Sequence, residues 1–275
     1  MQASEFNALL IKKFPFKPTA SQTLWMNEIT EFLFYAESNT VFVLKGYAGT
    51  GKSTSIGHLV RFLPKVEKRS VLMAPTGRAA TVMSGYAGKK AFTIHKQIYY
   101  TKSEGGSGMK FTLKPNKYKN TLFVVDEASM IGDDRQNTKL FENGSLLGDL
   151  MQYVDAGFNC KLLLVGDPAQ LPPVHLNLSP ALDADYLLHE FNKEVVLCTL
   201  EEVVRQKMNS GILANATYLR TFLEEQAGTD FQFDVSVASD VERMIEGNAI
   251  LEALEESIQN EGLEETVFID RKSHV

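Results

Sequence analysis

Short runs of apolar residues recur along the chain, and most are rich in Val, Leu and Phe without polar alternation. Near-continuous apolar runs are typical of strands in a parallel sheet that is covered on both faces. Helical stretches such as residues 53–63 separate several of the runs. The pattern therefore predicts an α/β fold with a mostly parallel sheet between layers of helices. The predicted strands are VFVLK (41–45), SVLMA (70–74), TLFVVD (121–126), KLLLVGD (161–167), EVVLC (194–198) and TVFI (266–269).

Three regions depart from this alternation. Residues 99–119 hold a Gly-Ser cluster between two short alternating segments, which predicts a β-hairpin insertion. Residues 130–150 are polar at first and then helical. From Leu200 onward the chain becomes helical and acidic, which indicates solvated helix faces. The acidic region 224–265 suggests no function.

Composition limits the compartment and the partners. A chain of 275 residues is long enough for one or two domains. Its net charge of -6 gives no global affinity for nucleic acid, so any such site must be a local basic patch. Cys160 and Cys198 lie in apolar runs and are expected to be free buried thiols, as in a reducing compartment. No apolar run is long enough to span a membrane and no signal-peptide pattern is present, so we expect a cytoplasmic protein.

The segment GYAGTGKST follows the first predicted strand and fits G-x-x-x-x-G-K-[ST] without a mismatch. Such a glycine-rich loop turns backbone N–H groups toward phosphate oxygens at the start of a helix. The motif predicts a nucleoside triphosphate as the ligand, with Lys52 at the β- and γ-phosphates and Ser53 on Mg²⁺. The predicted nucleotide-binding residues of the loop are Gly46, Ala48, Gly49, Thr50, Gly51, Lys52, Ser53 and Thr54.

Two further strand ends carry candidate chemistry. In TLFVVDEASM, Asp126 is placed to coordinate Mg²⁺, and Glu127 beside it to polarise an attacking water. A carboxylate base next to the metal aspartate favours hydrolysis over transfer to a bound hydroxyl. In KLLLVGDPAQLPPV, Gln170 stands on a stiff loop where it could contact the γ-phosphate and a neighbouring surface.

Taken as an ordered set, the motifs resemble those of superfamily 1 DNA helicases, in the 5′-to-3′ branch of RecD-like and Dda-like enzymes. The similarity spans roughly residues 15–206, and only the phosphate loop is specific by itself. The segments that carry it are GYAGTGKST, APTGRAA (74–80), TIH (93–95), DEASM (126–130), GDPAQLPPV (166–174) and LEEVVRQ (200–206).

The resemblance implies roles for residues that the local pattern leaves open. APTGRAA would contact single-stranded DNA, with Pro75, Thr76 and Arg78 as candidates, although an ordinary strand-to-helix turn has the same sequence. Thr93 and His95 would form a second contact with the strand, although a lone histidine is more often structural.

The resemblance also assigns two residues to the nucleotide. Arg205 would reach the γ-phosphate and stabilise charge in the transition state, unless it is a surface arginine in a salt bridge. Gln22 would read the adenine edge. The alternative is that Thr19 and Gln22 form a helix capping box after Pro18.

The predicted hairpin is basic and contains aromatic residues. Lysines could contact backbone phosphates, and aromatic rings could stack on bases or wedge at a duplex fork. In related enzymes an insertion at this place serves as a strand-separating pin, but a solvated, mobile hairpin fits the sequence equally well. The residues concerned are Lys102, Lys110, Lys114, Lys117, Lys119, Tyr99, Tyr100 and Phe111.

The resemblance implies a RecA-like domain in which the GDPAQ strand separates the Asp126 strand from the phosphate-loop strand. Motors of this family have two such domains. We expect residues 1–98 and 120–265 to form the first, residues 99–119 its insertion, and residues 266–275 the start of a truncated second. Without the second domain, we expect weak binding of Mg·ATP, poor hydrolysis and no processive unwinding.

The sequence thus indicates the first motor domain of an ATP-dependent DNA helicase, acting on single-stranded DNA and forks and not at a membrane. RecD-like subunits also work inside exonuclease complexes, so helicase–nuclease partner subunits are compatible with the resemblance. Two alternatives stay open: a small-molecule kinase that uses the same loop, and a non-catalytic nucleotide-binding scaffold.

Overall fold

The computed structural model describes residues 1–103, 109–133, 141, 144–171, 173, 176, 178–204, 210–224, 231–236, 240–263 and 266. The chain divides into two compact units, Met1–Arg205 and Gln206–Val275. The first unit holds all the strands of the described part of the chain, and the second holds two helices. This division at residues 205 and 206 differs in position from the boundary between motor domains that we expect at residues 265 and 266, and that boundary stays a prediction.

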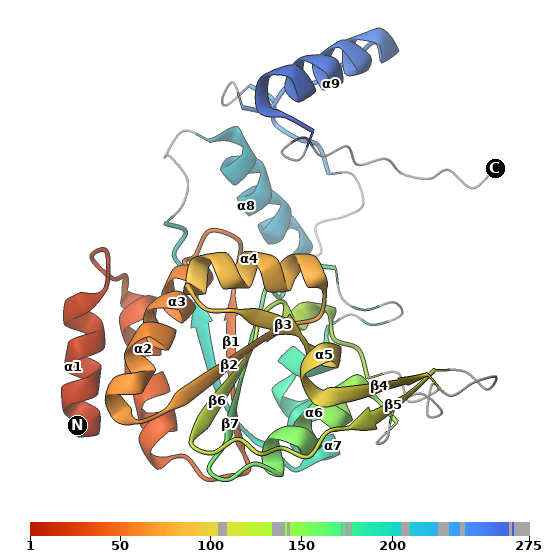
Figure 1. Ribbon diagram of the computed structural model, residues 1–275. Helices are drawn as coiled ribbons and strands as arrows, with labels where there is room; N and C mark the ends of the chain where they lie inside the picture. Colours follow the sequence, from red (N-terminus) through yellow and green to blue (C-terminus); the bar gives the residue numbers. More distant parts are fainter. Residues whose placement is uncertain are drawn as a thin grey trace. The chain divides into compact units, whose positions relative to one another are not determined.

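A six-stranded parallel sheet forms the centre of the first unit, in the order β3-β2-β6-β7-β1-β8 (Figure 1). All the apolar runs predicted within residues 41–198 are strands of this sheet, and β7 separates β6 from β1 as the resemblance implied. The short strand β3 was not predicted, and TVFI (266–269) lies outside the described residues apart from Thr266. The strands are β1 (Thr40–Gly46), β2 (Arg69–Ala74), β3 (Ala91–Thr93), β6 (Thr121–Val125), β7 (Lys161–Gly166) and β8 (Glu194–Leu200).

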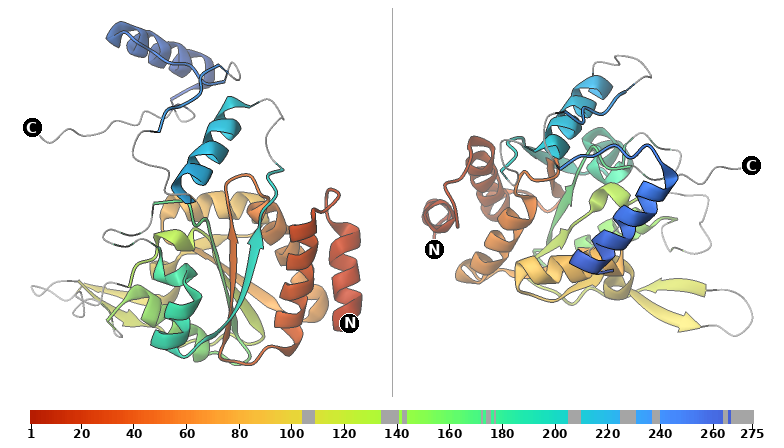
Figure 2. Two further views of the ribbon diagram at one scale, coloured as in Figure 1. Left: turned by 180° about the vertical axis from the view of Figure 1, so that it is seen from behind. Right: turned by 90° about the horizontal axis from the view of Figure 1, so that it is seen from above.

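Helices cover both faces of the sheet (Figure 2), which explains why the strands are apolar without alternation. Helices α1 (Ala3–Lys13), α2 (Ala20–Tyr35), α3 (Lys52–Phe62) and α4 (Gly77–Ala87) pack on one face. Helices α5 (Ile94–Ile98), α6 (Leu146–Asp155) and α7 (Ala184–Phe191) pack on the other. Among the described residues, short 3₁₀ turns also join these elements: η1 (Leu63–Val66), η2 (Ala128–Met130) and η4 (Pro180–Leu182).

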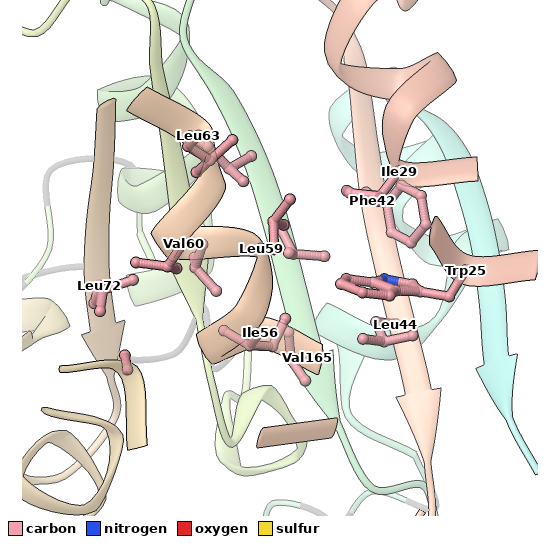
Figure 3. Packing of buried hydrophobic residues seen from close by; sticks show 14 of the residues in the cluster. Trp25, Ile29, Phe42, Leu44, Ile56, Leu59, Val60, Leu63, Leu72 and Val165 are labelled. Carbon is pink, nitrogen blue, oxygen red and sulfur yellow. The ribbon is translucent and has the colours of Figure 1, made fainter. Parts of the chain in front are cut away.

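Strand β1 shows how one strand serves both cores. Phe42 and Leu44 face Trp25 and Ile29 of α2 (Figure 3), whereas Val41 and Val43 face the opposite layer. Successive side chains of a strand point to opposite faces, so both sets are removed from water. Burying each such side chain contributes roughly 1.5–3 kcal/mol. This double burial holds β1 firmly, and the loop that follows it inherits a fixed starting point.

Helices α3 and α4 approach each other closely at Gly57. A Cβ atom at this position would lie 2.7 Å from the backbone oxygen of Tyr86 on α4, so only glycine fits. The contact brings the C-terminal end of α4 next to the helix that starts at the phosphate loop.

The predicted hairpin is present. Strands β4 (Tyr99–Ser103) and β5 (Met109–Leu113) pair antiparallel and extend from the side of the first unit (Figure 1). Its first residue is fixed to the core, because the Tyr99 hydroxyl donates to Asp149 Oδ2 of α6 at 2.7 Å. Residues 114–119, predicted as part of the hairpin, lead back to β6 without belonging to either strand.

The second unit contains α8 (Gly211–Glu224) and α9 (Gly247–Glu261), in line with the helical and acidic character of this region. Asp240 binds the start of α8 by accepting the backbone N–H of Gly211 and the hydroxyl of Ser210, both at 2.7 Å. Asn215 of α8 exchanges hydrogen bonds with the backbone of Asp234.

Two expectations about the chain as a whole can be compared with the structure. Cys160 and Cys198 are free and buried as predicted, and burial raises the pKa of both thiols. Among the described residues, none of the helices combines the length and the apolar character that crossing a bilayer requires.

Candidate nucleotide site

Loops at one edge of the sheet form the candidate site. In a parallel sheet all strands end at the same edge, and ligands of α/β sheets bind in the crevice outside these ends. The loop after β1 lies between the ends of β7 and β8, and the loop after β6 is next beyond β7. The phosphate loop, the GDPAQ loop, the DEAS loop and the segment after β8 are therefore neighbours, although up to about 150 residues separate them in the chain.

The phosphate loop ends at the first turn of α3. Gly51 is the N-cap of the helix and has φ 89°, a left-handed conformation that favours glycine. The Ser55 N–H donates to Gly51 O at 2.9 Å, so the helix starts directly at the loop. The N–H groups of the first turn have no carbonyl partner within the helix and carry its positive dipole end, which makes this position suited to an anion.

The Lys52 side chain hydrogen-bonds back to its own phosphate loop. Its ammonium donates to the carbonyl oxygens of Gly46 and Tyr47 at 2.5 and 3.0 Å, and stands 3.9 Å from Asp167 Oδ2. Burial lowers the Lys52 pKa, although the carboxylates of Asp167, Asp126 and Glu127 act in the opposite direction. A cation held among carbonyls and carboxylates at a helix start is placed to neutralise phosphate charge.

Asp126 follows β6, and protein donors hold both of its oxygens. The Tyr86 hydroxyl donates to Oδ2 at 2.6 Å, and the Glu127 N–H donates to Oδ1 at 3.0 Å. Burial and the adjacent carboxylate raise the Tyr86 pKa, so the phenol keeps its proton and remains a donor. Because Tyr86 is on α4, this bond connects the DEAS loop with the helix that follows β2.

Glu127 has an unusual backbone and a shifted pKa. Its φ of 56° lies in the left-handed region, which is rare for a residue with a side chain and is often found at functional sites. Burial and then Asp126 raise the Glu127 pKa, while a hydrogen bond from Gln170 and the charge of Lys52 lower it. The result is a carboxylate that binds a proton more readily than an ordinary glutamate, as a general base does.

Gln170 connects the GDPAQ loop with the DEAS loop. Its side-chain oxygen accepts the Ser129 hydroxyl at 2.7 Å, and its amide hydrogen-bonds Glu127. The loop is held at its start by the buried Asp167, whose Oδ1 accepts the Ala169 N–H at 2.9 Å. The structure thus brings Gln170 to the candidate base, and a shift of either loop would alter the bond between them.

The donors that could hold Mg²⁺ are a hydroxyl and a carboxylate. Ser53 is exposed in the first turn of α3, which follows β1. Asp126 directly follows β6, and β7 is the one strand between β6 and β1 in the sheet. The part of the chain that the structure describes has no group of three or more His, Cys, Asp or Glu side chains able to hold a metal ion alone. Mg²⁺ in nucleotide sites is held by one or two protein oxygens together with phosphates and water, so this donor set fits it.

Gln22 forms the capping box that was the alternative to an adenine contact. Its Oε1 accepts the Thr19 N–H at 3.1 Å, and its own N–H donates to the Thr19 hydroxyl at 3.3 Å. Its Nε2 donates to Thr50 O at 3.1 Å, so the buried amide also supports the phosphate loop. An adenine contact stays a prediction.

The segment after β8 covers the phosphate loop. The Val204 N–H donates to Gly49 O at 2.8 Å. Arg205 lies outside the described residues, so its role stays a prediction. Glu202 fixes the same segment to the start of α2, because it accepts the hydroxyls of Thr19 and Ser21 and the Ser21 N–H. The Ser21 hydroxyl is the largest of the contributions that hold the Glu202 pKa at about 2.

The candidate DNA contacts lie at the end of two paired strands. Thr76 caps α4 by accepting the Ala79 N–H, and Thr93 caps α5 by accepting the Lys96 N–H, both at 3.2 Å. Ala74 of β2 pairs with Thr93 of β3, so both threonines lie at the edge that holds the phosphate loop. Pro75 is partly buried and Arg78 is exposed on the first turn of α4. Both roles, capping and DNA contact, are open to a threonine in this position.

His95 has the structural surroundings that were the alternative to a DNA contact. Its ring packs 5.1 Å from Phe111, 5.8 Å from Tyr99 and 6.2 Å from Phe141. Burial lowers the His95 pKa, which favours the neutral ring. In the structure the His95 ring packs at the base of the hairpin. A DNA contact by His95 remains a prediction.

Three residues of the site were missed in the sequence. Asp167 stands inside the quoted GDPAQ motif, and its place directly after a core strand could have identified it. Tyr86 and Glu202 have no local pattern that would reveal them. Their partners Asp126 and Ser21 are 40 and 181 residues away, so only the fold brings them together.

The family model of the AAA domain matches residues 30–176, which is more than half of the chain. The chain therefore belongs to this family. The matched region contains the phosphate loop, the DEAS loop and the GDPAQ loop, so it includes the four neighbouring side chains Lys52, Asp126, Glu127 and Gln170.

The relatives include two named DNA helicases and a subunit of the RecBCD enzyme. The chain is 36% identical over 137 residues to the ATP-dependent RecD2 DNA helicase of Deinococcus radiodurans, covering 50% of this chain and 16% of the relative. It is 28% identical over 180 residues to the ATP-dependent DNA helicase dda of Enterobacteria phage T4, covering 64% and 37%. It is 26% identical over 229 residues to the RecBCD enzyme subunit RecD of Buchnera aphidicola, covering 66% and 35%. The chain thus spans little more than a third of these relatives at most.

A solved structure of Pif1 helicase from Bacteroides in complex with ADP-AlF3 and ssDNA matches with a TM-score of 0.47 and 18% identity. The match covers 92% of this chain and 58% of the Pif1 chain. A similarity of this size supports no conclusion about ligands.

The Glu202 bonds predict a pH dependence of stability. The folded pKa of about 2 lies below the ordinary value of 4.5, so the bonds stabilise the fold above pH 4.5 and lose this effect as pH falls toward 2. We expect Glu202→Gln to lower the free energy of unfolding by about 1 kcal/mol at pH 7, and by less as the pH falls below 4.5. Urea unfolding of both proteins between pH 7 and pH 3 measures the difference.

Glu201→Gln, at the exposed neighbouring position, is the matched control and should leave the free energy of unfolding unchanged. A destabilisation by Glu202→Gln that stays constant over the whole pH range would show that the charge of Glu202 is not the cause.

Proposed function

We propose that the chain is the nucleotide-hydrolysing motor domain of an ATP-dependent DNA helicase. The single observation that carries the proposal is the meeting of Lys52 with Asp126, Glu127 and Gln170 at the phosphate loop. A phosphate-binding loop alone would fit many functions. The added base and the linked glutamine favour hydrolysis coupled to movement, and two relatives are named as ATP-dependent DNA helicases and a third as a RecBCD enzyme subunit.

ATP binding begins with the phosphates. The backbone N–H groups of the loop and of the first turn of α3 receive the phosphate oxygens, and Lys52 leaves the carbonyls of Gly46 and Tyr47 to contact the β- and γ-phosphates. Ser53 and Asp126 would hold Mg²⁺ beside the phosphates. When bound, Mg²⁺ neutralises part of the phosphate charge. Gln22 contacts adenine from the start of α2.

Hydrolysis requires a base and compensation of negative charge. Glu127 takes the proton of the attacking water, because its raised pKa makes it a better base than an ordinary glutamate. Lys52 and Arg205 offset the charge that develops on the γ-phosphate. Gln170 senses this change, since its side chain bonds Glu127 and Ser129 directly. Small-molecule kinases transfer the same phosphate to an acceptor and have no need of a water-activating base.

DNA is proposed to lie along the edge where β2 and β3 end. Pro75, Thr76 and Arg78 on one loop and Thr93 and His95 on the next would contact the strand. The Tyr86 hydroxyl connects this region with the nucleotide site, because Thr76 caps the start of α4 and Tyr86, near the end of the helix, bonds Asp126. A displacement of α4 by DNA would thus move a group that holds the Mg²⁺ ligand.

The partners follow from the same proposal. Single-stranded DNA and DNA forks are the substrates, with the hairpin of β4 and β5 as a strand-separating element. A second motor domain completes the cleft, and helicase–nuclease subunits are further partners. We place the protein in the cytoplasm, where the free thiols Cys160 and Cys198 stay reduced.

Two substitutions separate nucleotide binding from hydrolysis. Lys52→Ala should weaken binding of a fluorescent ATP analogue at least tenfold, because the only cation within the loop is removed from the phosphates. Glu127→Gln should leave this binding intact and slow hydrolysis by roughly 10²–10⁴-fold, the usual contribution of a general base. Fluorescence titration and phosphate release, each with and without single-stranded DNA, provide the measurements.

Lys65→Ala, an exposed lysine on η1, controls for loss of charge and should change neither quantity. Equal hydrolysis by wild type and Glu127→Gln would contradict the assignment of the base. Tight nucleotide binding with no turnover in the wild type, even with DNA and a supplied second motor domain, would favour the non-catalytic scaffold.

Tyr86→Phe tests the support of the metal ligand. Removing the hydroxyl frees one oxygen of Asp126, and loss of such an outer partner usually costs 10–100-fold in metal affinity. We expect the Mg²⁺ concentration for half-maximal ATP binding to rise by about tenfold, with binding at saturating Mg²⁺ restored. Tyr100→Phe on β4 is the matched control. An unchanged Mg²⁺ requirement would show that Tyr86 does not position Asp126.

A further inference from the structure

An open groove of about 490 Å³ lies at the base of the hairpin, at the opposite edge of the sheet from the nucleotide site. Arg69 in its wall is the first residue of β2, and Thr76 follows the end of the same strand. At roughly 3.3 Å per residue the two positions are about 20 Å apart. The groove is therefore separate from the proposed DNA contacts at the carboxyl ends of the strands. Its main lining residues are Arg69, Tyr100, Lys114, Lys117, Tyr118 and Tyr153.

Hydrogen bonds fix the walls of the groove in place. The Gln97 amide donates to the Tyr118 hydroxyl at 2.9 Å, across the groove from α5 to the segment before β6. Asn116 Nδ2 donates to Tyr153 O at 2.7 Å, and its Oδ1 accepts the Tyr118 N–H at 2.8 Å. The Phe158 N–H in turn donates to Tyr118 O. The tyrosine rings thus stand on a backbone that is tied to α6 and α5, so the shape is preformed.

The lining is cationic and aromatic. Arg69 and Lys117 are exposed, and Lys114 Nζ lies 5.8 Å from the centre of the Tyr100 ring while donating to Lys96 O at 2.7 Å. None of the described residues that line the groove is acidic, although the whole chain has a net charge of -6. Tyr100 is 47% exposed, so part of its side chain is accessible from solvent.

We propose that this groove binds single-stranded nucleic acid. Unpaired bases stack on Tyr100 and Tyr118, and the phosphates that flank them contact Arg69 and Lys117. Exposed aromatic rings beside cations are the features that hold single strands without reading sequence. A duplex keeps its bases stacked inside, so it could use the cations but not the rings. The inference rests on the groove itself and does not require the chain to hydrolyse ATP.

The test combines an affinity and its salt dependence. A fluorescein-labelled dT20 oligonucleotide is titrated with the 275-residue chain, and anisotropy is followed over a series of salt concentrations. Each lost phosphate contact lowers the slope of log K against log salt by about 0.7 for a single strand. We expect the double variant Arg69→Gln, Lys117→Gln to lower the slope by about 1.4. Tyr100→Ala should weaken binding about tenfold through lost stacking and leave the slope unchanged.

Two control variants distinguish oligonucleotide binding at the groove from binding at the proposed DNA contacts of the motor. Lys12→Gln combined with Lys13→Gln removes two exposed charges from α1 and should change neither quantity. Arg78→Gln should lower the slope independently of the groove variants. Oligonucleotide binding that responds to Arg78→Gln and not to the groove variants would overturn this inference and leave the proposed function standing. A wild-type chain that binds ATP and no oligonucleotide would overturn the groove as well. Crosslinking of iododeoxyuridine in the oligonucleotide to Tyr100 or Tyr118 would support it directly.

Discussion

The parallel direction of the six strands is the constraint on which the site depends. Because every strand ends at the same edge, residues from four distant segments meet without any local sequence contact between them. The order β6-β7-β1-β8 places the GDPAQ loop between the phosphate loop and the DEAS loop. Lys52 consequently stands among the carboxylates of Asp167, Asp126 and Glu127, and its lowered pKa shows that burial outweighs their attraction. The ammonium donates to two backbone carbonyls of the loop itself, in a position fixed by β1, and it therefore lies next to the proposed phosphate position.

Around this centre, single hydrogen bonds join elements that would otherwise be independent. Tyr86 connects α4 with Asp126, Gln170 connects the loop after β7 with Glu127, and Val204 connects the segment after β8 with the phosphate loop. Each bond joins a loop of the candidate site to another element of the fold. The arrangement is suited to a protein in which a change at the phosphates must reach a distant surface, and much less suited to a rigid binding module.

A feature of the fold or of the site can be predicted from the sequence when a local pattern of residues specifies it. Continuous apolar strands and the phosphate loop are local patterns, so β1, β2, β6, β7 and β8 and the start of α3 could be predicted. The place of β7 between β6 and β1 followed from resemblance to a family. By contrast, Gln22 carries both a capping box and a bond to Thr50, and no local pattern distinguishes such a residue from one that contacts adenine. The contacts of Tyr86 and Glu202 could not be predicted, because they depend on packing between helices and loops that are far apart in the chain. The packing of His95 against Phe111 and Phe141 is of the same kind.

A crystal structure of this chain with Mg²⁺ and a non-hydrolysable ATP analogue tests the central claim most directly. The account predicts that the triphosphate lies against the amides that follow β1, with Lys52 turned from its two carbonyls to the phosphates and Mg²⁺ between Ser53, Asp126 and the nucleotide. Density for the nucleotide at any other edge of the sheet, or a Lys52 ammonium that still contacts Gly46 and Tyr47 beside bound phosphates, would contradict it.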